Sequence, residues 1–90
     1  MRGLNSNLDV TGELSLAILP IGAQARVIAV NGSGQIARRL MEMGVVPGAP
    51  VRVIKAAPLG DPIEVRVRGY HLALRRTEAQ MISVTITSDK

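Results

Sequence analysis

The segment from Ile63 to Arg68 alternates strictly between aliphatic and charged side chains (IEVRVR). Successive side chains of a β-strand point to opposite faces, so this pattern predicts a strand with Ile63, Val65 and Val67 on a buried face. The charged residues between them must face water. This is the cleanest period-two alternation in the chain, and it requires a fold in which a sheet covers a core on one side only.

Four other segments carry strand signals. Each is rich in β-branched or aliphatic residues and is bounded by turn residues, and the alternation within 71–75 and 82–86 again places aliphatic side chains on one face. The connecting turns contain glycine, proline, asparagine or aspartate. The predicted strands are 26–30, 51–57, 71–75 and 82–86, in addition to 63–67.

One helix is predicted over residues 35–43, because Ile36, Leu40 and Met43 recur at helical spacing. Ser33 is a candidate N-cap, and Gly44 supplies a left-handed residue after the last turn. Residues 77–80 resemble a single further helical turn.

Five short strands and one helix in 90 residues make one domain with a thin core. A flat sheet of such short strands would leave long exposed edges, and a small closed barrel avoids them. We therefore predict a mainly β fold, a small SH3-like β-barrel of about five strands with one short inserted α-helix. Residues 15–87 form this domain, residues 1–14 a flexible leader and residues 88–90 a tail.

The composition excludes several classes of function. Cysteine is absent, which removes disulfides, thiolate zinc sites and cysteine nucleophiles, and fits a reducing cytoplasm. No stretch approaches the roughly 20 apolar residues that span a bilayer, and residues 1–24 lack a signal-peptide core. The sequence predicts a cytoplasmic protein with no direct membrane insertion.

The reactive side chains are too few for an enzyme. There is one histidine, and no nucleophile stands beside a plausible base. For metals, the weak candidates are His71, Asp61 and Glu64, which could hold a divalent transition metal loosely at the surface. Their spacing is not diagnostic, and a lone histidine beside a turn is more often a solvated residue. No resident cofactor is expected.

Nine of the eleven lysines and arginines lie between Arg26 and Arg76, in a chain of net charge +4. A barrel would leave the arginines that alternate with buried residues on its outside, which explains most of them without a function. Gathered into one patch, they would favour an acidic partner. These arginines are at positions 52, 66, 68, 75 and 76.

Three segments resemble one known family, the ferrous iron transport protein A (FeoA) family. They are RLMEMGVVPG (39–48), APLGDPIEVRVRGY (57–70) and LALRR (72–76), whose glycines, prolines and charges follow an order that composition would not produce. The resemblance extends over about residues 15–86, with Leu16, Leu19, Gly22 and Val27 similar to the family's opening segment. Residues 1–14 precede the point where typical members begin.

The resemblance implies an SH3-like barrel and a role in bacterial ferrous iron uptake. Such proteins accompany a large membrane permease with a cytosolic GTPase domain, and assist or regulate it by contact. We therefore expect a cytoplasmic accessory or regulatory protein that docks onto the cytosolic part of the permease and is not an enzyme. The predicted contact residues are Met41, Leu59, Tyr70, His71, Arg75 and Arg76.

Two alternatives remain open at the level of sequence. One is a metal-sensing SH3-like regulatory domain related to that of iron-dependent repressors, although a helix-turn-helix part is missing here. The other is nucleic-acid binding, which the positive charge permits. Only Tyr70 could stack on a base, so no nucleic acid partner is expected. The sequence also leaves a homo-oligomer open.

Overall fold

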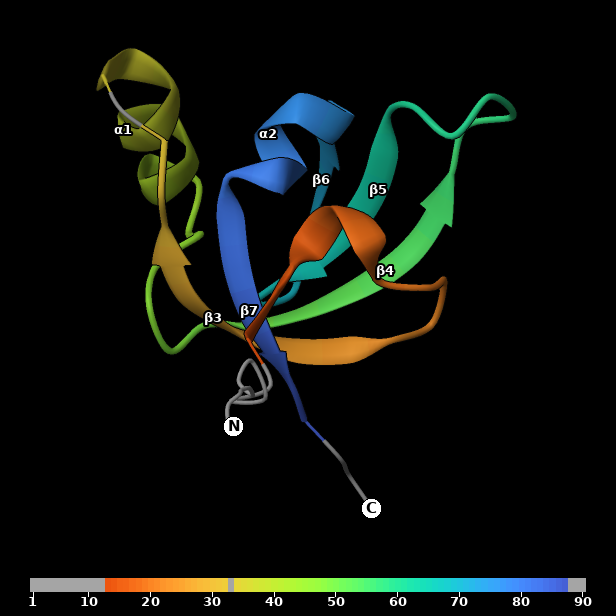
Figure 1. The fold of residues 1–90 in the computed structure, drawn as a ribbon, viewed down its shortest axis with the longest axis horizontal. Coiled ribbons are helices and arrows are strands. Elements are labelled where there is room, and N and C mark those ends of the chain that lie inside the picture. The colour runs from red at the N-terminus through yellow and green to blue at the C-terminus, as the bar shows by residue number, and fades with distance from the viewer. Residues whose placement is uncertain (1–12, 33, 88–90) are drawn as a thin grey trace, which may run out of the picture.

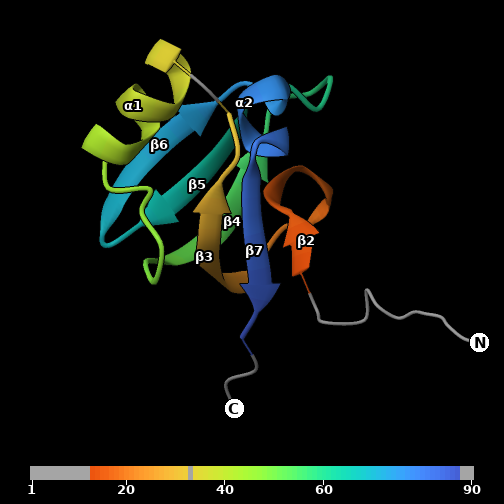
Figure 2. The ribbon, with the colours of Figure 1, turned by 60° about the vertical axis from the view of Figure 1, so that its left-hand side comes forward.

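Six antiparallel strands form one strongly curved sheet, in the order β2-β7-β3-β4-β5-β6 (Figures 1 and 2). The computed structural model describes residues 13–32 and 34–87. The strands are β2 (Glu13–Ser15), β3 (Gln24–Val30), β4 (Pro50–Ala56), β5 (Ile63–Val67), β6 (Tyr70–Leu74) and β7 (Ile82–Ile86). All five predicted strands are confirmed, each to within two residues at either end.

Strand β2 is the one that the sequence did not predict. It pairs with β7, with Leu14 opposite Val84, and so includes Glu13 and Leu14, which the sequence analysis had assigned to the leader. A strand of three residues is too short to show alternation, which is why the pattern did not reveal it. Residues 1–12 of the leader and the tail 88–90 lie outside the described residues.

Three short helices accompany the sheet in the described part of the chain. Helix α1 spans Gly34–Glu42, one residue earlier than predicted, and Gly44 takes the left-handed conformation expected after its end, with φ of 102°. Helix α2 (Arg76–Gln80) is the predicted helical turn. The third, the 3-10 helix η2 (Leu16–Ile18), was not predicted. The candidate cap Ser33 lies outside the described residues.

The core is aliphatic, as the single aromatic residue requires. Ile63, Val65 and Val67 of β5 are all at most 5% exposed, which confirms the predicted buried face. Both η2 and α2 contribute buried side chains, and these two helices contact each other. In the described part of the chain no ladder joins the edge strands β2 and β6, so the barrel is not closed by hydrogen bonds.

Two register shifts help the short sheet to curve. One lies in β3, between Val27 and Ala29, where it pairs with β7. The other lies in β4, between Val53 and Lys55, where it pairs with β5. An extra residue on one strand bends that strand and increases its twist, so the barrel shape has a local backbone cause.

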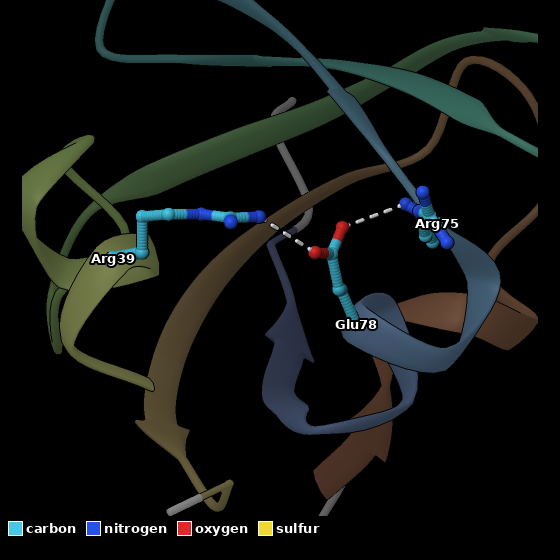
Figure 3. Close-up of polar contacts among 3 residues, drawn as sticks. All are labelled: Arg39, Arg75 and Glu78. Carbon is cyan, nitrogen blue, oxygen red and sulfur yellow. Dashed lines mark hydrogen bonds and ion pairs between the residues drawn. The ribbon is translucent and has the colours of Figure 1, made fainter. Parts of the chain in front are cut away.

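A buried carboxylate fixes the start of α2 (Figure 3). Glu78 is 8% exposed. One of its oxygens accepts a hydrogen bond of 2.8 Å from the backbone N–H of Arg75, and the other lies 3.0 Å from Nη2 of Arg39. The first contact satisfies a backbone donor that the helix itself leaves free.

We expect the variant Glu78→Gln to lower the free energy of unfolding by about 1 kcal/mol, because the buried cap loses its charge. The variant Arg39→Gln should have a smaller effect, since the side chain of Arg39 is 64% exposed and half-exposed ion pairs contribute little. Urea denaturation of both variants tests this. A larger loss in Arg39→Gln than in Glu78→Gln would contradict the ranking.

Candidate functional site

Arg76 joins three segments that are far apart in the sequence. Its Nη1 donates to the carbonyl oxygen of Ala17 in η2 at 2.9 Å, and its Nη2 donates to the carbonyl oxygen of Gly60 at 2.9 Å. Its backbone N–H donates to Oδ1 of Asp61 at 3.0 Å. One planar guanidinium therefore holds η2 against the loop 57–62, which connects β4 to β5.

The loop 57–62 is also held by its own backbone. The N–H of Gly60 donates to the carbonyl of Ala57 at 2.7 Å, and the N–H of Ala57 donates to the carbonyl of Pro62 at 2.9 Å. Gly60 has φ of 86°, and the Asp61–Pro62 bond is cis. Leu59 stands at the tip of this loop with 95% of its surface exposed. A large aliphatic side chain is thus presented to solvent on a loop that has backbone hydrogen bonds of its own.

Two further aliphatic side chains are exposed on the segment that Arg76 ties to this loop. Ile18 and Ile21 are each 64% exposed. Their segment is fixed to β4, because the N–H of Gly22 donates to the carbonyl of Val53 at 2.7 Å and the N–H of Val53 donates to the carbonyl of Ala23 at 3.0 Å. We call Ile18, Ile21 and Leu59 the apolar rim.

A shallow hollow of about 260 Å³ lies at the base of the same loop. It is largely apolar, with Lys55 and Glu64 as its charged members. An exposed apolar side chain such as Leu59, on a loop that lines a hollow, is typical of surfaces that bind another protein. The residues that line it are Lys55, Ala56, Ala57, Pro58, Pro62, Ile63, Glu64 and Ala73.

Three of the predicted contact residues belong to the loop 57–62 or to the start of α2. Two of them are exposed, and the third is engaged within the protein. Leu59 is a member of the apolar rim, and Arg75 has an exposed side chain at the start of α2. Arg76 is half-buried, and its guanidinium already donates to two carbonyls. The geometry makes Arg76 a residue that positions the rim.

The other predicted contact residues lie elsewhere. Tyr70 opens β6 and is 70% exposed, at the end of β5 opposite to the loop 57–62. Met41 is 43% exposed on α1. The end of α1 approaches this same region, because a Cβ on Gly44 would lie 3.9 Å from the side chains of Val67 and Arg68. The structure therefore does not bring Met41 and Tyr70 together with Leu59.

Ile18 and Ile21 were missed by the sequence analysis. Aliphatic residues before a strand are usually core, and their neighbours Leu16 and Leu19 are indeed buried. The exposure of Ile18 depends on the 3-10 turn of η2, and a turn of three residues leaves no periodic signal in the sequence.

The weak metal candidates do not converge. Nδ1 of His71 lies 3.0 Å from Oε2 of Glu64 on the outer face of the sheet, while Asp61 accepts its hydrogen bond from the backbone of Arg76. Among residues 13–32 and 34–87 no group of three or more histidines or acids is arranged to hold a metal ion. The pair His71–Glu64 offers two ligands, fewer than a built site supplies.

No helix in the described ranges is long and apolar enough to cross a bilayer.

Comparison with known proteins gives a consistent result. The model of the FeoA domain family matches residues 14–86. A relative from Porphyromonas gingivalis, an Fe(2+) transport protein A/Fe(2+) transporter FeoB fusion protein, is 39% identical over 75 residues. That match covers 83% of this chain but 9% of the fusion protein, so the chain spans a small part of that relative's length.

Solved structures of similar proteins share the fold. The FeoA protein from Chlorobium tepidum is 44% identical, with a TM-score of 0.80 and coverage of 86% of this chain and 74% of that chain. FeoA from Stenotrophomonas maltophilia, a prokaryotic SH3 domain protein solved with zinc, is 37% identical, with a TM-score of 0.71 and coverage of 79% and 88%. The predicted SH3-like fold is confirmed.

A likeness at lower identity extends to the fold alone. IdeR from T. acidophilum is 21% identical, with a TM-score of 0.76 over 90% of this chain and 37% of that chain.

Proposed function

Because this chain belongs to the FeoA domain family, we propose that it is a non-catalytic accessory protein of ferrous iron transport. It acts by docking onto the cytosolic part of the ferrous iron permease through the apolar rim and the adjoining hollow. The observation that carries this proposal is the exposure of Ile18, Ile21 and Leu59 on segments that Arg76 holds together.

The choice of partner is supported by the fused relative. In the Porphyromonas gingivalis protein, a part similar to this chain and an Fe(2+) transporter belong to one polypeptide. Linking two binding partners raises their effective concentration, so a fusion is useful where the separate proteins also meet. We extend that association to this chain as a contact between two molecules.

The choice of surface is supported by its rigidity. Association costs free energy for every loop and side chain that it orders. The loop 57–62 carries hydrogen bonds of its own and is tied to η2 before any partner arrives. Leu59 can therefore enter a pocket on the permease with little ordering cost.

Docking is favoured over metal sensing. The likeness to IdeR is one of fold, and within the described residues no group of three or more histidines, aspartates or glutamates is arranged to hold a metal ion. For docking, the chain offers three exposed aliphatic side chains and a hollow at the base of the loop that carries Leu59.

We expect the variant Leu59→Glu to weaken binding to the soluble part of the permease about tenfold, as for a buried apolar residue of an interface. Its thermal stability should match that of wild type, because Leu59 is 95% exposed. Biolayer interferometry with the immobilised permease domain measures the affinity.

The matched control is Ile36→Glu, which places the same charge on a 39% exposed side chain of α1, a helix outside the segments 16–22 and 57–62 that carry the apolar rim. It should bind like wild type. Equal affinities for wild type and Leu59→Glu, or an equal loss in both variants, would contradict the proposed surface.

A further inference from the structure

A second hollow, of about 280 Å³, lies toward the opposite end of β4 and β5 from the loop 57–62. Three of the residues that line it are arginines, and no acid is among them. Gln24 and Thr87 add polar groups, and the N–H of Thr87 donates to the carbonyl of Gln24 at 3.1 Å. We call Arg52, Arg66 and Arg68 with this cavity the basic hollow.

The arginines of the basic hollow form no ion pair within the described part of the chain. Among the described residues, no carboxylate oxygen lies within 4.0 Å of a side-chain nitrogen of these three arginines. Arg52 and Arg66 are also direct partners across the β4–β5 ladder, so both project from the same face. Like charges directly opposite each other destabilise a sheet, and the fold tolerates this repulsion here.

The backbone conformation of Arg68 also indicates a functional role for the basic hollow. The turn between β5 and β6 has two central residues, Arg68 and Gly69, with φ of 53° and 90°. Such turns favour asparagine or glycine at the first position, because a left-handed backbone is unfavourable for a residue with a long side chain. A residue held in this region against its preference is often functional.

We propose that the basic hollow binds a phosphoryl group, as free phosphate or as part of a larger phosphate ester. Guanidinium groups bind phosphate oxygens through paired hydrogen bonds. Three guanidiniums around one cavity suit a compact anion with about two negative charges at pH 7. The carboxylates of an acidic protein segment carry one charge each and are spaced along a chain, which fits a single hollow less well.

This site is independent of the docking function. None of the residues that line it belongs to the apolar rim, and its ligand is a small anion that the isolated 90-residue chain can be tested with. Failure of phosphate binding would leave the permease contact untouched, and failure of the permease contact would leave this site untouched.

The test is isothermal titration calorimetry of the full chain with inorganic phosphate, diphosphate and adenosine monophosphate, at constant ionic strength set by chloride. We expect saturable binding of at least one of the three. The variant Arg66→Gln should weaken that binding about tenfold, since a charge-assisted hydrogen bond is lost. The control Arg38→Gln removes an exposed arginine of α1 and should bind like wild type.

Thermal melts separate loss of the site from loss of the fold. Without ligand, Arg52→Gln and Arg66→Gln should melt at or above the wild-type temperature, because each relieves the repulsion across the ladder. Phosphate should raise the melting temperature of wild type more than that of either variant. The three anions also show whether the group is recognised free or within an ester.

Two outcomes would overturn the proposal. One is phosphate binding that survives in Arg66→Gln unchanged. The other is no binding of any of the three anions. If a polyglutamate peptide then binds in an Arg66-dependent way, the basic hollow belongs to an acidic protein segment.

Discussion

Truncating Leu40 to alanine is expected to lower the free energy of unfolding by about 2–5 kcal/mol, the range for removing a fully buried leucine side chain. Leu40 is 0% exposed and is the single buried side chain of α1, whose residues are all described. The carbonyl of Leu40 also accepts a hydrogen bond of 3.0 Å from the N–H of Val45, which closes the turn at the end of α1. Small domains have a total stability of about 5–15 kcal/mol, so this variant should lose a large fraction of its stability.

Urea denaturation followed by far-ultraviolet circular dichroism measures the effect. The matched control is Met41→Ala, the next residue on the helix, which is 43% exposed and should change stability by less than about 0.5 kcal/mol. A loss below about 1 kcal/mol in Leu40→Ala would mean that α1 is not anchored to the core through this side chain.

Leu40 also shows how far the sequence could predict the fold. Its helical spacing with Ile36 and Met43 places it on the inner stripe, and the structure buries it completely while leaving Ile36 39% exposed. Periodicity gives the direction of a side chain on its own element. How deeply that side chain is buried depends on which neighbouring elements cover it, which periodicity does not contain.

The same distinction explains the sheet. Alternation in 63–67 predicted three buried residues, because one strand's pattern is enough to assign its two faces. The number of strands and the order β2-β7-β3-β4-β5-β6 depend on pairing between segments far apart in the chain. Strand β2 forms by pairing with the free edge of β7. Its own three residues are too few to show an alternating pattern in the sequence.

The candidate site was less predictable than the fold. Leu59 could be singled out because it follows a proline in a turn rich in glycine and proline, where a large aliphatic side chain is unusual. Ile18 and Ile21 could not, since their exposure comes from the hydrogen bonds of η2 and Gly22 with distant partners. The arginines were predicted to face outward, but the pairing of Arg52 with Arg66 needed the register of two strands.

The second large effect is expected at Arg76. The variant Arg76→Met should lower the free energy of unfolding by about 2 kcal/mol, because two hydrogen bonds from a charged donor are lost and both carbonyls lie in a part-buried region. Methionine keeps much of the aliphatic length of the side chain, so packing changes little. The backbone hydrogen bond to Asp61 also remains available, so α2 should still start at this residue.

Arg76→Met should weaken binding to the permease by about 30-fold or more relative to wild type, equivalent to about 2 kcal/mol. This loss is larger than the one expected for Leu59→Glu. Leu59→Glu changes one side chain of the apolar rim, whereas the loss of Arg76 releases the loop 57–62 from η2 and separates Leu59 from Ile18. Hydrogen exchange reports the release directly, since the amide of Gly60, bonded to the carbonyl of Ala57, should exchange faster.

Two controls isolate the contribution of the guanidinium. Arg75→Met makes the same change one residue earlier, at an exposed side chain, and should leave stability within about 0.5 kcal/mol of wild type. Arg76→Lys keeps the charge but lacks the planar fork that reaches two carbonyls at once, so it should resemble Arg76→Met in exchange at Gly60. If Arg76→Lys instead behaves as wild type in both exchange and permease binding, the positive charge alone is sufficient. The geometric role assigned to Arg76 would then be wrong.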